Sequence, residues 1–329
     1  MTDAAVARHR RIGSLELLLV GLIALAFSAG AMSAFVADNP KLRVAATVFC
    51  GVFVQALPFL LLGTVIGGLI AAFVDTEALS RRLPGNPAVA VTAAGVGGAL
   101  LPGCECGSVP VARRLFGPGT RGAAALTFML SAPAINPVVL VATAVAFPGR
   151  PGVVLARCVA SLLTAVVMGM MWSRWGRDEW ITRSLPEPHH DGASRWTVFV
   201  EAARHDFLSA APYLVLGAAA AAALRVAVPP WIFTHVTGQL LPGVLVMALL
   251  AVVLALCSEA DAFVAASLTM LPLVPRLVFL VVGPAVDVKL AAMQTGMFGR
   301  RFAVRFGPAT FVVATVVATV VGLIVLGDH

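Results

Sequence analysis

Long apolar stretches, interrupted at a few points, dominate the chain. Several are long enough for a membrane-spanning helix, which needs about 20 mostly apolar residues. These stretches are Gly13–Val36, Val44–Val74, Ala123–Phe147, Gly152–Trp175, Phe199–Val228, Leu277–Phe298 and Phe302–Leu326. The pattern therefore predicts an all-α fold, a polytopic transmembrane helical bundle.

Two further apolar stretches are broken in the middle. Ala88–Leu115 contains Pro102-Gly103 followed by Cys104-Glu105-Cys106, and Leu240–Leu273 contains Cys257-Ser258-Glu259. Each half is only about 12–17 residues long, which is short for a span. We expect two helical hairpins whose tips carry the cysteines. The pattern is the same for a re-entrant hairpin and for a full helix pair.

The order of span, hairpin, span and span occurs twice, about 151 residues apart. Cys106-Gly107-Ser108 aligns with Cys257-Ser258-Glu259, and the break at 132–136 aligns with the break at 283–287. Three spans plus a hairpin make an odd number of crossings, so the second copy would enter the membrane upside down, as in many transporters. We predict an N-terminal span outside the repeat (1–43), a first permease repeat (44–175), a cytoplasmic linker (176–198) and a second permease repeat (199–329).

Composition and charge agree with a membrane protein. The chain is 60% hydrophobic and 12% charged, whereas a soluble protein has about 45–50% apolar and about 25% charged residues. The net charge of +7 needs no nucleic acid to explain it, because Lys and Arg gather at cytoplasmic membrane edges. With a cytoplasmic N-terminus, 16 of the 23 Lys and Arg residues fall on the cytoplasmic side. The outer side receives Lys41, Arg43, Arg150, Arg157, Arg225 and Arg276. This bias predicts a multi-pass protein of the cell (inner or plasma) membrane.

A few ionisable residues are clustered by the repeat at its breaks. They are Glu105 at the first tip, Glu259 and Asp261 at the second tip, and Asp287 and Lys289 at the second helix break, with Asn136 as the uncharged counterpart of Asp287 at the first break. A charge in hydrocarbon costs about 2.5–3.5 kcal/mol, so such residues usually line a substrate or ion path. We expect substrate contacts from Glu105, Asn136, Glu259 and Asp287. Ion or proton coupling is expected from Asp261, Asp287 and Lys289. The alternative is a structural ion pair, with Lys289 paired to Asp287 or across the repeats.

The cysteines Cys104, Cys106 and Cys257 form a sharper candidate site. Two residues spaced as Cys104 and Cys106 do not share a helix face, so both thiols can reach one ligand only where the backbone is non-helical. Pro102 and Gly103 supply that break. Soft thiolates select Cu(I), Zn(II) or trivalent arsenic. We predict that the three cysteines bind substrate as metal-type ligands; the alternative is that they pack as small apolar residues.

The run from Pro102 to Leu115, followed by Ser131-Ala132-Pro133-Ala134-Ile135-Asn136-Pro137, resembles the ArsP-like predicted permeases. These bacterial inner-membrane proteins carry a Cys-Ser-Cys-Gly-x-x-Pro-Leu motif and then an Ala-Pro-x-Ile-Asn-Pro motif. The likeness extends from Val44 to about Leu326. The resemblance implies efflux of trivalent organoarsenicals, or copper or zinc handling, with Cys104 and Cys106 as the family's cysteine pair. Glu105 stands where the family usually has Ser, which shifts the expectation toward a metal cation or a proton-coupled carrier.

The sequence contains no G-x-x-x-x-G-K-[ST] motif, so transport energy would come from an ion gradient, the substrate itself or a partner subunit. We predict a permease that exports a soft, thiophilic species, with no enzymatic activity and no resident cofactor. Its expected partners are the lipid bilayer, a small inorganic or organometallic substrate, and a partner subunit or second copy. Two alternatives stay open. One is a carrier for a non-metal solute or anion in which the cysteines are structural, and the other is a membrane enzyme or redox protein that uses the cysteine pair.

Overall fold

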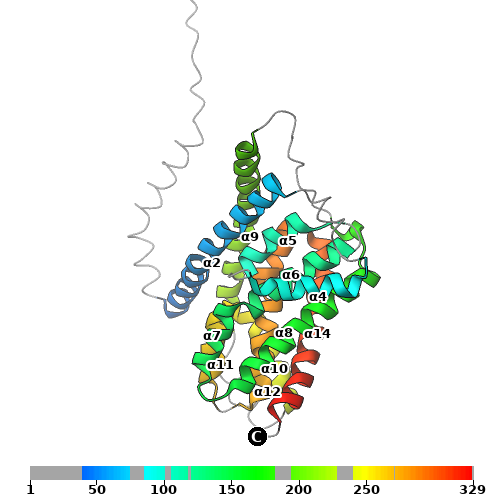
Figure 1. Cartoon of the computed structure of the whole chain (residues 1–329). Helices are drawn as coiled ribbons and strands as arrows, with labels where there is room; N and C mark the ends of the chain where they lie inside the picture. The colour runs from blue at the N-terminus through cyan, green and yellow to red at the C-terminus, as the bar shows by residue number, and fades with distance from the viewer. Residues whose placement is uncertain are drawn as a thin grey trace, which may run out of the picture.

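The computed structural model describes residues 39–74, 85–100, 105–117, 120–181, 194–227, 240–269 and 271–327, and every regular element within these ranges is helical (Figure 1). The first half contains α2 (Pro40–Phe73), α4 (Pro87–Gly97), the 3-10 turn η1 (Gly98–Leu100), α5 (Glu105–Leu115), α6 (Thr120–Ile135), α7 (Pro137–Ala146) and α8 (Pro151–Trp175). The second half follows the turn η2 (Asp178–Trp180) and contains α9 (Arg195–Ala227), α10 (Leu240–Leu254), α11 (Ser258–Ser267), α12 (Leu273–Ala285), α13 (Val288–Met297) and α14 (Arg300–Leu326). The predicted span Gly13–Val36 lies outside the described residues.

The two halves share one element order: a long helix, two short helices, a broken helix and another long helix. Their packing also repeats. Helices α4 and α5 contact α6 as α10 and α11 contact α12, and α6 packs on α8 as α12 packs on α14. The short helices α4, α5, α10 and α11 and the two predicted breaks are present, and the hairpin arrangement of the short helices stays a prediction. The inversion of the second half stays a prediction.

Six of the described helices are long and apolar enough to cross a membrane, when each broken helix (121–146 and 273–297) is counted as one. Their outer faces are apolar and exposed within the described part of the chain: Val54 is 68% exposed, Leu216 61% and Ile324 76%. Contact between water and so much apolar surface is unfavourable, whereas contact with lipid is not. The chain is therefore a multi-pass membrane protein.

The long helices begin earlier than their apolar stretches predict. The Asn39 side chain accepts a hydrogen bond from the Lys41 amide (3.1 Å), and Pro40 occupies the first turn, so α2 starts at Pro40 rather than Val44. Helix α9 starts at Arg195, which makes the last residues of the predicted linker helical. A polar first turn can continue a helix beyond the lipid-compatible segment, so the cytoplasmic linker 176–198 stays a prediction.

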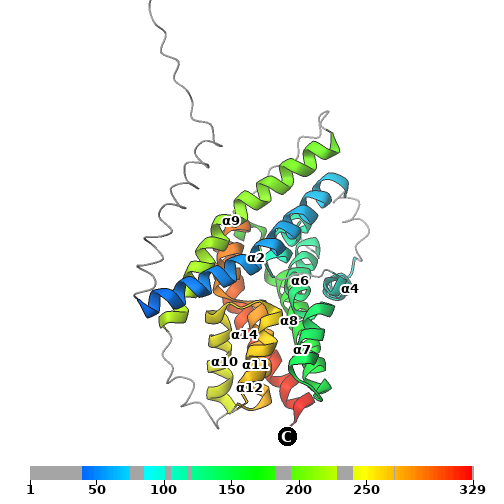
Figure 2. The same cartoon turned by 90° about the vertical axis from the view of Figure 1, so that its left-hand side faces the viewer.

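Helices α2 and α9 pack along each other, and Figure 2 shows them crossing the molecule side by side. Each contains an internal proline, Pro58 or Pro212, and each remains one helix, which agrees with simple bending at those prolines. Helix α5 lies against α2, and α13 lies against α9. Helices α2 and α9 therefore hold α5 and α13 in place.

Gly63 on α2 and Gly107 on α5 bring two helix backbones together. A Cβ at Gly63 would overlap the Gly107 backbone, and a Cβ at Gly107 would lie 2.9 Å from the Phe59 carbonyl oxygen. No side-chain rotation can relieve such an overlap, so we expect Gly63→Ala to destabilise the protein by about 1–3 kcal/mol. The measurement is thermal unfolding of the purified protein in detergent.

Gly51→Ala is the matched control on the same helix, since a Cβ there would meet nothing within 4 Å. Its stability should rise by up to about 1 kcal/mol, because alanine favours a helix over glycine. Equal melting of the two variants would show that the approach of α2 to α5 is not tight.

Candidate functional site

A buried group of charged side chains lies where the short helices meet the broken helices. We call it the central charge cluster, and it consists of Glu105, Arg157, Glu259, Asp261, Asp287 and Lys289. The elements cross between halves here, since α5 contacts α13 and α11 contacts α7. Helix α5 of the first half therefore packs on α13 of the second half, and helix α11 of the second half packs on α7 of the first. This crossing brings together residues that are far apart in the sequence.

Lys289 is the centre of the cluster. Its Nζ donates a hydrogen bond to Glu105 Oε1 (2.5 Å) and lies 3.9 Å from Asp287 Oδ2, and all three side chains are at most 1% exposed. The Nζ also contacts the Ala255 carbonyl oxygen at 3.5 Å, at the C-terminal end of α10. Ala255 has a φ of +46°, which is uncommon for a residue other than glycine. Both predicted pairings are therefore present, one with the neighbouring Asp287 and one with Glu105 of the other half.

Asn136 and Asp287 occupy equivalent places at the two helix breaks. Each accepts a hydrogen bond from a backbone amide in the first turn of the next helix, Asn136 from Val139 (3.0 Å) and Asp287 from Leu290. They are the N-caps of α7 and α13, and a side-chain acceptor at this position stabilises a helix start. Asp287 Oδ2 has no hydrogen-bond partner in the described chain. The predicted correspondence of the two residues is confirmed, and their contact with substrate stays a prediction.

Arg157 is a member of the cluster that the sequence analysis assigned to the outer side. That assignment is wrong, because α8 begins at Pro151 and Arg157 lies inside it, fully buried. Its Nη1 donates to Thr143 Oγ1 (2.6 Å) and its Nη2 to the Ser258 carbonyl oxygen (2.8 Å). It is also within electrostatic reach of Asp261 and Glu259. A charge inside an apolar segment was the signal that could have identified it.

Asp261 and Glu259 lie in the first turn of α11, where the helix dipole favours negative charge. Asp261 is 1% exposed, and Glu259 is half-buried. The Asp261 carboxylate packs directly on α12, because a Cβ at Gly283 would lie 2.5 Å from Asp261 Oδ2. Both carboxylates are within electrostatic reach of Glu105 and Lys289. The predicted acidic residues are thus gathered into one site.

Cys106 and Cys257 lie in one packed cluster with Leu290 and Met293, and both cysteines are at most 3% exposed. Both sulfurs are within electrostatic reach of the Lys289 ammonium. Cys104 lies outside the described residues. Within the described ranges, no group of three His, Cys, Asp or Glu side chains is arranged to hold a metal ion. The ligand set of Cys104, Cys106 and Cys257 therefore stays a prediction.

An apolar cavity of about 530 Å³ reaches the central charge cluster from the side. It lies between α10, α13 and α14, and its walls include Val252, Val286 and Phe311. Asp287 is the acidic residue of its lining. The cavity could admit an apolar group close to a buried carboxylate.

The far end of α5 carries two arginines that are buried rather than solvated. Arg114 donates to both carboxylate oxygens of Asp206 on α9, at 2.7 and 2.8 Å, and Arg113 Nε donates to the Met297 carbonyl oxygen (2.9 Å). The charge bias counts Arg113 and Arg114 among the 16 cytoplasmic Lys and Arg residues, and the sequence pattern did not indicate Asp206 as their partner. The side chains are 8–9% exposed for the arginines and fully buried for Asp206.

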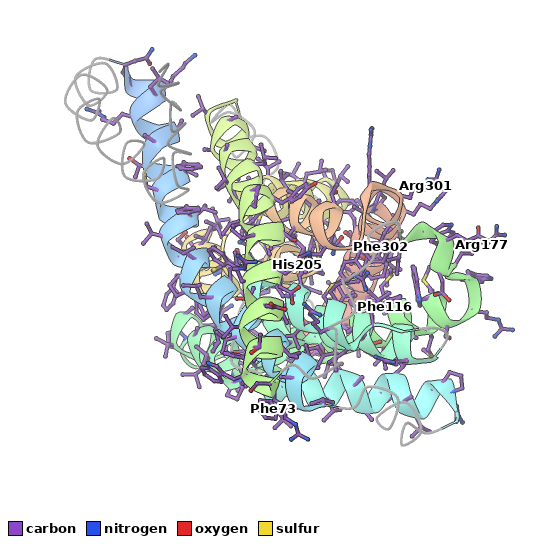
Figure 3. All side chains as sticks on the ribbon, turned by 90° about the horizontal axis from the view of Figure 1, so that it is seen from above. Phe73, Phe116, Arg177, His205, Arg301 and Phe302 are labelled. Carbon is purple, nitrogen blue, oxygen red and sulfur yellow. The ribbon has the colours of Figure 1, made fainter. Side chains whose placement is uncertain are left out.

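Aromatic rings pack around this end of the molecule. Phe116 lies edge-on to Trp172 and to Phe298, and Phe298 stacks on Phe302. Figure 3 shows Phe116 and Phe302 toward the side of the molecule from which Arg177 and Arg301 project. The rings pack the adjoining ends of α5, α8, α13 and α14 together.

Comparison with known proteins identifies the family. Residues 41–324 match the family model ArsP_1, described as "Predicted permease". The chain is 36% identical to the UPF0718 protein YcgR of Bacillus subtilis over 279 residues, which cover 83% of this chain and 94% of that protein. It is 31% identical to a "Putative two-component membrane permease complex subunit" of Streptococcus mutans over 284 residues, or 84% of this chain and 94% of that protein. No solved structure matches the chain. The chain belongs to the ArsP-like family of predicted permeases.

Proposed function

We propose that this permease is a secondary-active exporter of a soft, thiol-binding species, either a trivalent arsenical or a metal cation. The observation that carries the proposal is the placement of Cys106 and Cys257. Both are buried in one cluster within electrostatic reach of Lys289. Cysteine thiolates are the ligands that soft ions prefer. Cys104, two residues before Cys106, would supply a third thiol.

The charge balance of the site supports a cationic or proton-coupled step. With every member ionised, the central charge cluster holds four carboxylates against one ammonium and one guanidinium. Its negative excess is buried, where charge is expensive and a cation or proton would relieve it. Lys289 pairs with Glu105 and lies near Asp287, and its single positive charge balances only one of these two carboxylates. A carboxylate of this excess would hold a proton when no cation is bound at the thiols, and a cation that binds there would displace that proton, which would couple the two movements.

The structure favours this proposal over the anion carrier. Binding an anion at helix N-termini requires free amides, and Asn136 and Asp287 already accept amide hydrogen bonds at the starts of α7 and α13. The negative excess of the cluster also repels anions. The two halves would reorient around the site as inverted repeats do, in an inner membrane with a cytoplasmic N-terminus. A partner subunit is part of the proposal, since the Streptococcus mutans relative is named a subunit of a two-component complex.

Cys106→Ser and Cys257→Ser should each lower transport at least about tenfold, because losing one soft ligand weakens metal-type binding by that order. The assay is accumulation of trivalent methylarsenical, Cu(I) or Zn(II) by inside-out vesicles. Cys50→Ser is the matched control, since Cys50 is exposed on α2. It should transport as the wild type does.

Asp287→Asn separates the thiol site from the coupling site. It keeps the cap acceptor of α13 but removes the charge, so transport should lose its dependence on a pH gradient while substrate binding remains. The thiol site would be refuted if both cysteine variants transport as the wild type does while Asp287→Asn does not transport. That result would favour a carrier in which the cysteines are structural.

A further inference from the structure

A polar pocket, distinct from the apolar cavity described above, lies at the opposite end of the bundle from the aromatic rings. It has a volume of about 380 Å³ and lies between the loop that joins α7 to α8 and the loop that joins α11 to α12. Figures 1 and 2 show α7, α11 and α12 at the end where the chain terminates. Phe147, Arg150, Thr269 and Arg276 line it, and none of its described lining residues is acidic. It is separate from the central charge cluster.

Arg276 is fixed in the wall of this pocket. Its Nε donates to the Ala265 carbonyl oxygen (2.7 Å) and its Nη2 to the Ala266 carbonyl oxygen (2.9 Å), both in the last turn of α11. The guanidinium lies over the Phe147 ring, 4.9 Å from its centroid, and the residue is 8% exposed. These contacts use two of the five N–H groups of the guanidinium. The others are held in position to bind an acceptor.

A second arginine, Arg150, lines the same pocket as Arg276. Arg150 is close enough for the two charges to repel each other, and no acidic residue of the lining compensates them. Arg150 and Pro272 are also the N-cap residues of α8 and α12, and neither provides a side-chain cap. The N-terminal ends of α8 and α12 add to the positive potential through their helix dipoles. Together, the two guanidinium groups and the two helix starts favour an oxyanion.

We propose that this pocket binds the phosphate headgroup of an anionic phospholipid. Arginine pairs with phosphate through two parallel hydrogen bonds, and Thr269 can add a hydroxyl donor. The pocket lies at the ends of membrane-spanning helices, where headgroups are found. Exposed apolar side chains continue from it along the bundle, such as Val145 (64%) and Leu155 (58%), and they can contact the acyl chains. A bound headgroup would join the α7–α8 loop to the α11–α12 loop and so connect the two halves on this side.

The test measures lipid retention by the full-length protein in neutral detergent. Native mass spectrometry with phosphatidylglycerol should show binding to the wild type, and phosphatidylcholine at equal concentration should bind at least about tenfold more weakly, since its choline offsets the phosphate charge. Arg150→Gln should weaken phosphatidylglycerol binding about tenfold, as expected for the loss of one charge-assisted contact. Arg150 is exposed, so the variant is expected to fold.

Arg174→Gln is the control, because it removes an equal charge from an exposed residue at the other end of α8. It should change phosphatidylglycerol binding less than twofold, within the scatter of a surface charge. Equal binding by wild type and Arg150→Gln would overturn the proposal. So would displacement of the lipid by millimolar inorganic phosphate, since the pocket would then be a site for a free anion.

Discussion

Replacing Lys289 with methionine should destabilise the protein by about 3–5 kcal/mol and abolish transport. The ammonium lies 2.5 Å from Glu105 and 3.9 Å from Asp287, and none of the three side chains reaches solvent. Without the ammonium, the buried carboxylates of Glu105 and Asp287 would lose their nearest positive charge. Unfolding of the purified protein in detergent gives the stability, and vesicle accumulation gives the transport.

A double variant separates the two effects. Lys289→Met with Glu105→Met removes the closest pair together, and apolar replacement of a buried pair is often neutral for stability. We expect the double variant to recover most of the lost stability but no transport. A Lys289→Met protein that unfolds like the wild type would show that the ammonium does not neutralise the cluster. That result concerns the ion pair alone and is independent of the substrate.

Asp206→Ala should be as damaging as the loss of Lys289, at about 3–5 kcal/mol, although Asp206 lies outside the central charge cluster. The aspartate accepts two hydrogen bonds from Arg114, at 2.7 and 2.8 Å, and it is fully buried. The pair fixes the end of α5 to α9. Arg114 would keep only a contact of 3.4 Å to the Ala202 carbonyl oxygen. The measurement is the same unfolding experiment.

The neighbouring His205 supplies the control. Its ring nitrogen is 3.5 Å from Asp206, and its side chain is 43% exposed. His205→Ala should therefore change stability by less than about 1 kcal/mol. The double variant Arg114→Met, Asp206→Leu should regain stability, because it removes both buried charges. If Asp206→Ala and His205→Ala unfold alike, the Arg114 pair does not hold α5 in place.

Much of the fold could be predicted because apolar length and helix breakers act locally. The proline and glycine positions marked the break after Ile135 and the break after Ala285, and the structure has both. The short halves around Cys106 and Cys257 gave the two pairs of short helices. Helix starts were predicted less well, since Asn39 and Ser194 extend α2 and α9 by capping polar turns outside the apolar segments.

The residues of the candidate site were predicted better than the contacts between them. Rare charges in apolar segments identified Glu105, Asp261 and Lys289, because hydrocarbon makes every such residue costly. Arg157 and Asp206 were missed. The charge count treated every arginine as a flanking residue, and Asp206 lies near the polar start of the predicted span 199–228, next to His205. Burial alone distinguishes them from surface charges.

The sequence by itself determined that the chain is a helical membrane protein, where its helices break, and which polar residues lie at the breaks. These properties follow from hydrophobicity and backbone chemistry within a few neighbouring residues. Only the tertiary structure decided that Lys289 binds Glu105, 184 positions away, and that Arg114 binds Asp206, 92 positions away. Ion pairs over such separations depend on which helices pack together, and packing is a property of the whole bundle.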